Sequence, residues 1–189
     1  MIVVRRIVGW LTAVVGIIFL GGVVAGIVQT SASANPCPDV PPTTVGEIDV
    51  PRGPVAGYCQ SELVNAAKIM TAARDMGIGQ RTQTVGVMTA IGESKLRNLD
   101  YGDAAGPDSR GVFQQRDNGA WGSLEQRMDP YLAARTFFTK LTKVPGWQTM
   151  DPTTLAHAVQ VNTDAGYYSQ FWSQAQRIVA TLTPGAVRS

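Results

Sequence analysis

One glutamate stands where the sequence predicts an unusual environment for a carboxyl group. Glu93 falls at the C-terminal end of a predicted helix, and its neighbours Ile91 and Leu96 are apolar. The negative end of the helix dipole and an apolar environment both disfavour a carboxylate, so both raise its pKa. An acid that stays protonated near neutral pH can donate its proton to a leaving oxygen, as the cleavage of a glycosidic bond requires. A solvated glutamate at a helix end is the competing interpretation.

Two aspartates follow Glu93 and could supply a second carboxylate. Asp103 and Asp108 lie in a segment rich in Gly, Asp and Pro, residues 97–111, which predicts either a long loop or a small hairpin. An inverting glycosidase uses a second carboxylate, roughly 6.5 to 9.5 Å from the acid, to activate water. Aspartates in such loops commonly stabilise turns instead, and this alternative applies to both residues.

The residues around Glu93 resemble the lysozyme-like superfamily, in particular soluble lytic transglycosylases and goose-type lysozymes. Those enzymes have a helix ending in Glu-Ser, a polar Gly-rich loop, a segment of the type Gly-Leu-Met-Gln, and later a helix bearing Ala-Tyr-Asn. The corresponding segments here, between Ser61 and Trp172, are Glu93-Ser94, residues 97–111, Gly111-Val112-Phe113-Gln114-Gln115, Ala158-Val159-Gln160 and Gly166-Tyr167-Tyr168. The third motif departs from the family pattern, because Val159 replaces the tyrosine and Gln160 is a longer amide.

The resemblance implies an enzyme of the cell wall. Glu93 would be the single catalytic acid and base of a peptidoglycan lytic transglycosylase, cleaving the bond between MurNAc and GlcNAc without a cofactor. Ser94 would hold it, Gln114 would contact acetamido groups of the substrate, and Tyr167 or Tyr168 would place a hydroxyl near it. Gln160, in the altered motif, is a further expected substrate-binding residue. Hydrolysis of the lysozyme type, and an inactive binding or scaffold module of an envelope-spanning machine, remain alternatives.

Helical periodicity from Ser61 onwards predicts an all-α domain over residues 61–183, with at most a minor β-hairpin, followed by a tail at 184–189. The resemblance implies that its fold is lysozyme-like. Ser61, Thr82, Asp129 and Asp151 are the expected N-caps, and proline follows both aspartates. The predicted helices run from Ser61 to about Met76, from Thr82 to Glu93, from Pro130 to near Val144, from Pro152 to near Asn162, and from about Tyr167 to Leu182.

Residues 1–34 predict export. An uncharged apolar run, residues 7–28, follows Arg5 and Arg6. Its length suits a membrane-spanning helix of about 20 residues, whereas Ala32-Ser33-Ala34 suits cleavage by a signal peptidase. Both interpretations stay open. Both place the rest of the chain outside the cytoplasm by the positive-inside rule, anchored in the membrane or secreted into the cell envelope.

The cysteines and the charge fit such a compartment. Residues 35–60 form a Pro-rich linker, expected to be structureless except for a disulfide between Cys37 and Cys59, with two free thiols as the alternative. Leaving out Arg5 and Arg6 reduces the 16 basic residues to 14, which equals the 14 acidic ones. A balanced domain lacks the basic surface that nucleic acid requires. We expect no metal site, because the only histidine, His157, has no ligand-spaced partners. Peptidoglycan glycan strands are the expected partner, along with the membrane if the N-terminal segment is retained.

Overall fold

The structure is a computed structural model in which residues 35–185 are described. The predicted signal or anchor segment, residues 1–34, lies outside the described residues, and so does the end of the tail, residues 186–189. None of the helices in the described part of the chain has the length and apolar character that a membrane crossing requires.

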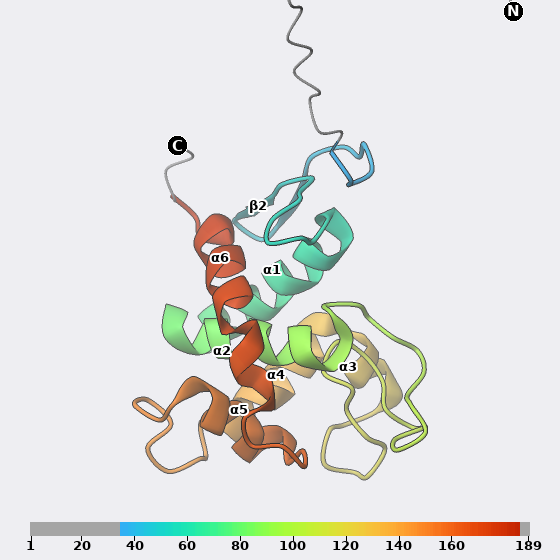
Figure 1. Ribbon diagram of the computed structural model, residues 1–189, viewed down its shortest axis with the longest axis vertical. Helices are drawn as coiled ribbons and strands as arrows, with labels where there is room; N and C mark the ends of the chain where they lie inside the picture. The colour runs from blue at the N-terminus through green and yellow to red at the C-terminus, as the bar shows by residue number, and fades with distance from the viewer. Residues whose placement is uncertain (1–34, 186–189) are drawn as a thin grey trace, which may run out of the picture. The chain divides into compact units, whose positions relative to one another are not determined.

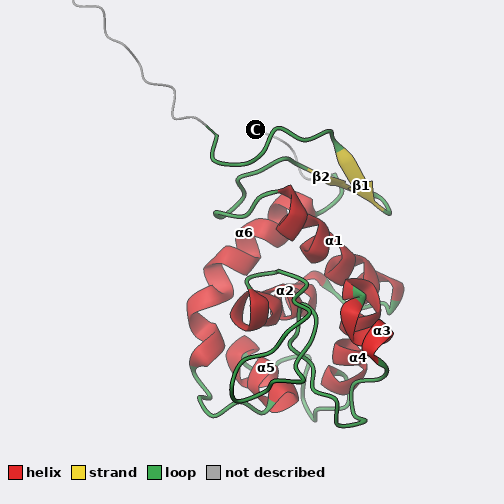
Figure 2. Cartoon of the chain, turned by 90° about the vertical axis from the view of Figure 1, so that its right-hand side faces the viewer, coloured by secondary structure: helices red, strands yellow, loops and turns green. Residues whose placement is uncertain are grey.

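The described residues are mainly helical, as predicted, with one small two-stranded sheet. The helices are α1 (Gln60–Asp75), α2 (Gln80–Ser94), α3 (Leu124–Met128), α4 (Pro130–Leu141), α5 (Pro152–Gln160), the 3-10 helix η1 (Tyr167–Phe171) and α6 (Trp172–Leu182). Helix α2 lies at the centre, with α1, α4, α5 and α6 around it (Figures 1 and 2). Every residue from Thr82 to Gly92 is buried, so α2 is a core helix without a solvent face.

Two glycines let neighbouring aromatic rings approach α2 closely. A Cβ atom on Gly86 would lie 2.5 Å from Cζ of Phe138, and one on Gly92 would lie 2.9 Å from Cδ1 of Tyr168. Glycine lowers helix propensity by about 1 kcal/mol relative to alanine. Here the tertiary packing requires the missing side chain at both positions, and the helix continues through them.

The arm at residues 35–60 is ordered, so the prediction of a structureless linker is wrong. Strands β1 (Thr43–Val45) and β2 (Ile48–Val50) pair antiparallel in the register Thr43 with Val50 and Val45 with Ile48. Ile48 and Val50 alternate with exposed Asp49 and are buried, and β2 packs against α1 and α6. The hairpin therefore joins the helical core. The segment 97–111, the other candidate for a hairpin, is a loop with an isolated bridge between Arg110 and Gln115.

The predicted disulfide is present. Cys37 and Cys59 are bonded, with their Cα atoms 5.4 Å apart and 22 positions apart in sequence. The bond joins the beginning of the arm to the residue that precedes α1, so both ends of the hairpin segment are held close to the helical part of the molecule.

Two of the four predicted N-caps are correct. Asp129 accepts hydrogen bonds from the backbone nitrogens of Tyr131 and Leu132, and Asp151 accepts one from Thr154, with proline at the first helical position in both cases. Ser61 and Thr82 instead lie inside α1 and α2, because the N-caps are Cys59 and Gly79, which make no side-chain capping bond.

The end of the chain differs from the single predicted helix. The backbone first forms η1 over Tyr167–Phe171 and then α6 from Trp172 to Leu182. The short helix α3 was not predicted, although it carries a capping box formed by Ser123 and Gln126. Helices α4 and α5 end at Leu141 and Gln160, slightly earlier than the sequence predicts.

Candidate active site

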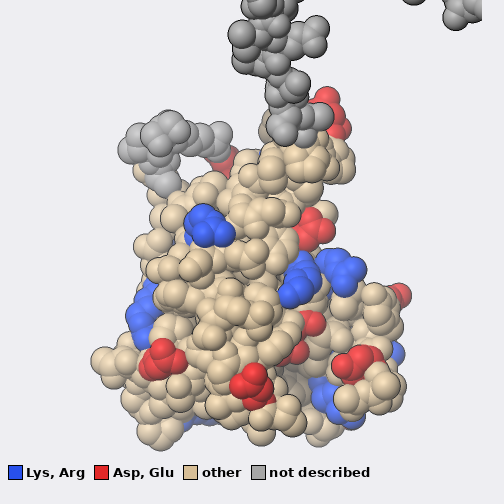
Figure 3. Space-filling view, in the orientation of Figure 1, with Lys and Arg blue, Asp and Glu red and all other residues tan. Residues whose placement is uncertain are grey.

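Glu93 opens onto a pocket where three separate segments of the chain meet. The pocket has a volume of about 320 Å³ and lies between the end of α2, the loop that follows it, and the connection between α5 and η1. Its lining residues are Gly92, Glu93, Asp103, Ser109, Gln114, Asn162, Thr163, Asp164 and Tyr167. Acidic and basic side chains are interspersed over the face of the molecule seen in Figure 3.

The carboxyl group of Glu93 is largely removed from water and hydrogen-bonded on two sides. The Tyr168 hydroxyl donates to Oε1 of Glu93, and the Gln160 side chain also bonds the carboxylate. Burial raises the pKa of Glu93 above its ordinary value of 4.5; the bonds from Tyr168 and Gln160 oppose this increase, and the negative charge of Asp103 adds to it. The net direction is upward, as the sequence predicts, and burial is its largest cause.

The two neighbouring tyrosines have different roles. Tyr168 is fully buried, and burial beside Glu93 raises the pKa of its phenol, which therefore remains a neutral hydrogen-bond donor. Tyr167 lines the pocket, and its hydroxyl donates to the carbonyl of Gly92 at 2.9 Å. The two rings meet edge to face with centroids 5.1 Å apart. Of the two candidates, Tyr168 is the residue whose hydroxyl reaches Glu93.

Ser94 lies beneath the pocket rather than in its lining. It is buried, and its Oγ lies 2.8 Å from the carbonyl oxygen of Val112 and 3.1 Å from that of Ala90. This hydroxyl links the end of α2 to the loop that carries Gln114. Ser94 therefore holds the end of α2 against this loop and does not face the pocket.

Gln114 and Gln115 point in opposite directions because the backbone turns between them. Gln114 has a φ of 47°, a left-handed conformation that is uncommon outside glycine, and its side chain lines the pocket. Gln115 is buried, and its amide donates to the carbonyl of Ala133 at 3.1 Å. The turn thus places one amide where a ligand can reach it and the other in the core.

Asp103 and Asp108, the two candidates for a second carboxylate, lie in different surroundings. Asp103 lines the pocket, and its Oδ1 also accepts hydrogen bonds from the backbone nitrogens of Ala105 at 3.0 Å and Gly106 at 2.8 Å. Asp108 is outside the lining and bonds Arg116 and the backbone nitrogen of Asp117. The bond from Asp117 is the main reason that the pKa of Asp108 is lowered. These contacts are those of a turn-stabilising aspartate, the alternative that the sequence offers for Asp108.

Five pocket residues were not found from the sequence: Gly92, Ser109, Asn162, Thr163 and Asp164. Three of them lie directly before η1. In that part of the sequence only Tyr167 and Tyr168 were expected to belong to the site. Asp164 accepts a hydrogen bond from the backbone nitrogen of Gly166 at 2.8 Å. Nδ1 of His157 lies 2.6 Å from Oδ1 of Asn162, so this histidine on α5 contacts the connection that lines the pocket.

A buried arginine braces the loop that carries Gln114. Arg127 at the end of α3 donates from Nη1 to the carbonyls of Asp108 at 3.2 Å and Gln115 at 3.3 Å, and its Nη2 lies 2.9 Å from Asp117. These contacts join both ends of the segment 108–117 to one side chain, so they hold the part of the loop that faces the pocket.

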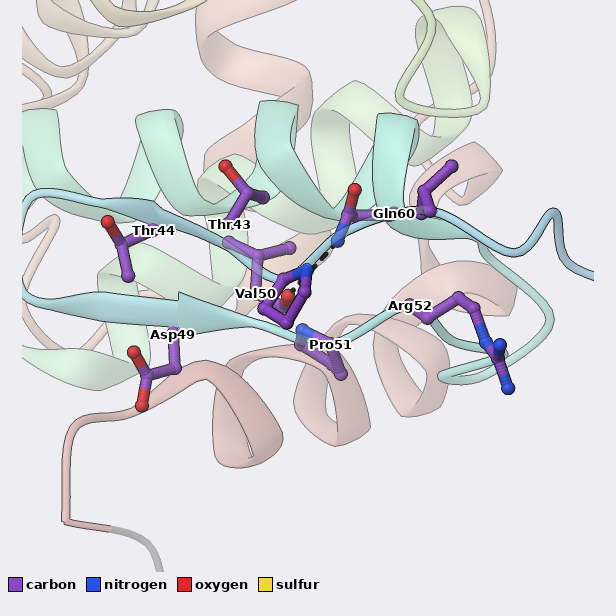
Figure 4. Close-up of a pocket in the computed structure, with 9 residues that line it drawn as sticks. Thr43, Thr44, Asp49, Val50, Pro51, Arg52 and Gln60 are labelled. Atoms are coloured by element: carbon purple, nitrogen blue, oxygen red, sulfur yellow. Dashed lines mark hydrogen bonds between the residues drawn. The ribbon is translucent and has the colours of Figure 1, made fainter.

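A larger pocket lies on the hairpin arm. It has a volume of about 770 Å³ and is lined by residues of β1, β2 and the start of α1. Figure 4 shows the amide of Gln60 turned toward Val50, while the side chains of Asp49 and Arg52 point away from it. Because both charged groups are exposed, this surface does not provide the buried acid that the Glu93 pocket provides.

Comparison of the chain with protein-family models and with curated proteins finds no match. Within residues 35–185 no three His, Cys, Asp or Glu side chains are grouped so that they could hold a metal ion.

Proposed function

We propose that the protein is an exported enzyme with a lysozyme-like fold that cleaves the glycan strands of peptidoglycan at the bond between MurNAc and GlcNAc. The observation that carries this proposal is the carboxyl group of Glu93, whose pKa is raised by burial and which faces an open pocket. A raised pKa increases the fraction of a carboxylic acid that is protonated at a given pH, and the protonated form is the state that a general acid needs. The mainly helical fold is compatible with the proposal.

In the proposed reaction Glu93 donates its proton to the bridging glycosidic oxygen as the bond to the muramic carbon breaks. The N-acetyl group of the substrate stabilises the positive centre that forms. The Glu93 carboxylate is then stabilised by its hydrogen bonds from Tyr168 and Gln160. It takes the proton from the O6 hydroxyl of the same muramic residue, whose oxygen closes the anhydro ring, and Glu93 is protonated again for the next cycle.

The altered third motif is compatible with activity. Gln160 hydrogen bonds both Glu93 and the carbonyl of Phe113, the latter at 3.0 Å, so an amide still contacts the acid from α5. Hydrolysis of the lysozyme type is the second candidate, because Asp103 places a carboxylate in the same pocket, where it could activate water.

The test is to incubate the full-length protein, purified in a mild detergent, with isolated peptidoglycan and to identify the soluble products by mass spectrometry. Glu93→Gln keeps the shape of the side chain and removes its acidic proton, and the matched control is Glu125→Gln on the exposed surface of α3. Anhydro-muropeptides from the wild type and the control, absent with Glu93→Gln, are the expected result. Reducing-end products would favour hydrolysis with Asp103, and intact glycan strands with all three proteins would refute the enzymatic proposal.

A further inference from the structure

A groove along helix α4 gathers basic side chains of that helix. It has a volume of about 390 Å³ and shares no lining residue with the Glu93 pocket. We call it the α4 groove, and its lining residues are Ala120, Gln126, Leu132, Arg135, Thr136, Thr139, Lys140 and Lys143. Three of these side chains are cations and none is acidic, although basic and acidic residues are equal in number after residue 34. The α4 groove is therefore a local concentration of positive charge.

None of the three cations of the α4 groove has a carboxylate partner among residues 35–185. The basic members of the salt bridges there are Arg52, Arg74, Arg116 and Arg127. The Arg135 guanidinium instead lies 5.9 Å from the centre of the Tyr131 ring. The Lys140 ammonium lies 4.5 Å from the centre of the Trp121 ring, and Lys143 is exposed. Contacts with aromatic rings orient a cation but do not neutralise its charge, which a ligand can still meet.

Groups that can bind a peptide backbone lie beside these cations. Thr136 and Thr139 each donate the hydroxyl proton to a carbonyl of the preceding turn of α4, at 3.2 and 2.8 Å. Each hydroxyl oxygen therefore keeps a lone pair that can accept an N–H group. Gln126 uses Oε1 in the cap of its own helix, so its amide nitrogen can donate to a ligand. Leu132, which is 38% exposed, and Ala120 add apolar surface.

This combination fits a short acidic peptide better than a phosphodiester polymer. A phosphodiester chain has no N–H groups for the threonine hydroxyls to accept. Strong binding of such a polymer also needs a longer track of cations than three. Arg135 and Lys143 are eight positions apart, or about 12 Å along the helix axis. About four extended peptide residues span that distance.

The proposed substrate carries peptides of this kind. The glycan strands of peptidoglycan bear short peptide stems that are rich in alanine and have free carboxylates. Carboxylates form charge-assisted hydrogen bonds with Lys and Arg. We propose that the α4 groove binds these peptide stems through their carboxylates. The inference rests on the proposed function for the identity of the peptide, and it adds a second contact with the cell wall outside the Glu93 pocket.

The test compares two probes with a neutral fluorophore at the N-terminus. One is the tetrapeptide alanyl-γ-D-glutamyl-diaminopimelyl-D-alanine with free carboxylates, and the other is the same peptide with every carboxylate amidated. Binding to the full-length protein in a mild detergent is followed by fluorescence anisotropy at low ionic strength. We expect the free acid to bind at least about tenfold more tightly than the amide. Added salt should reduce this preference, because the groove is open to solvent.

Substitutions assign the preference to the α4 groove. Lys143→Gln should lower it at least about threefold, and adding Lys140→Gln should remove most of what remains. Arg177→Gln is the matched control, since it removes one exposed cation of α6 outside the groove and should leave the preference intact. Glu93→Gln should bind both probes as the wild type does, because the Glu93 pocket is a separate site.

Equal binding of the two probes would overturn the inference. So would a preference that survives the double lysine variant, or one that Glu93→Gln abolishes, because the peptide would then bind elsewhere. Binding of poly(glycerol phosphate) or of phosphatidylglycerol vesicles without binding of the free acid would assign the groove to a different ligand. The proposed function is judged separately by the cleavage of peptidoglycan. Cleavage without peptide binding refutes only this inference, while peptide binding without cleavage by the wild type refutes only the proposed function.

Discussion

Replacing Glu93 by glutamine should stabilise the protein, and the gain should depend on pH. Burial raises the pKa of Glu93, so the folded protein disfavours the carboxylate more than the unfolded chain does. The stability that the protonated group contributes is fully present below the ordinary pKa of 4.5 and is lost as the pH rises through the raised value. Glutamine stays neutral throughout, so the variant avoids this loss.

The expected gain follows from the chemistry of one ionisation. Each tenfold change in the acid dissociation constant of Glu93 between the unfolded and the folded chain corresponds to about 1.4 kcal/mol, which sets the scale of the expected gain in the free energy of unfolding at about pH 7. For a domain of this size, each kcal/mol raises Tm by about 2 to 4 °C. At about pH 4 both side chains are neutral, both can accept the bond from Tyr168, and the difference should nearly vanish.

The assay is unfolding by urea, followed by circular dichroism at several pH values between about 4 and 8. Glu125→Gln, exposed on α3, is the control and should change stability by less than about 0.5 kcal/mol at every pH. A Glu93→Gln protein less stable than the wild type by a constant amount would refute the reasoning. An advantage that shrinks as the pH rises would refute it as well, because Glu93 would then be a carboxylate that the fold stabilises.

Three further substitutions test the surroundings of Glu93. Tyr168→Phe removes a hydrogen bond to a charged group, worth about 1.5 to 3 kcal/mol to the carboxylate form, so the pKa of Glu93 should rise further. The alkaline limb of the pH profile of kcat/KM for glycan cleavage should move upward. Gly92→Ala places a Cβ atom 2.9 Å from the Tyr168 ring and should cost about 1 to 3 kcal/mol in thermal unfolding. Arg127→Met leaves buried carbonyls without their donor and should cost about 2 to 3 kcal/mol in urea unfolding.

For each of the three substitutions, a specific result would contradict the prediction. An alkaline limb that stays in place in Tyr168→Phe would mean that Glu93 is not the acid whose ionisation limits the rate. Tyr131→Phe is the matched control, since its hydroxyl bonds Asp75 on the surface. Wild-type stability of Gly92→Ala would show that the ring can move away from α2. An Arg127→Met protein as stable as the parent would show that the loop 108–117 is held without the arginine.

The parts of the fold that could be predicted are those determined by residues close together in the sequence. Asp129 and Asp151 precede proline and cap their helices, since both the cap and the proline act within a few residues. The hairpin could not be predicted because each strand has only three residues and lies among prolines. What orders it is burial of Ile48 and Val50 beside helices that are distant in sequence.

The residues of the candidate site also divide into those that the local sequence predicts and those that only the fold brings together. Glu93 has a local signal, because its position at a helix end among apolar neighbours predicts a raised pKa. Asp164 has none, since only the fold brings the α5–η1 connection to the end of α2. Arg127 was missed because arginine is mostly found on surfaces. Its burial depends on carbonyls and an aspartate in a separate loop.

The geometry of Glu93 follows from three consecutive residues that face different sides of the same helix end. Successive side chains on an α-helix are separated by about 100°. Gly92 therefore faces the tyrosine rings, Glu93 faces the pocket, and Ser94 faces the loop at Val112. Lys95 then ends the helix in a left-handed conformation, with a φ of 58°. A larger residue in place of Gly92 would displace the Tyr168 ring. Loss of the Ser94 hydroxyl would release the loop that carries Gln114. Both substitutions should therefore disturb the site although Glu93 itself is unchanged.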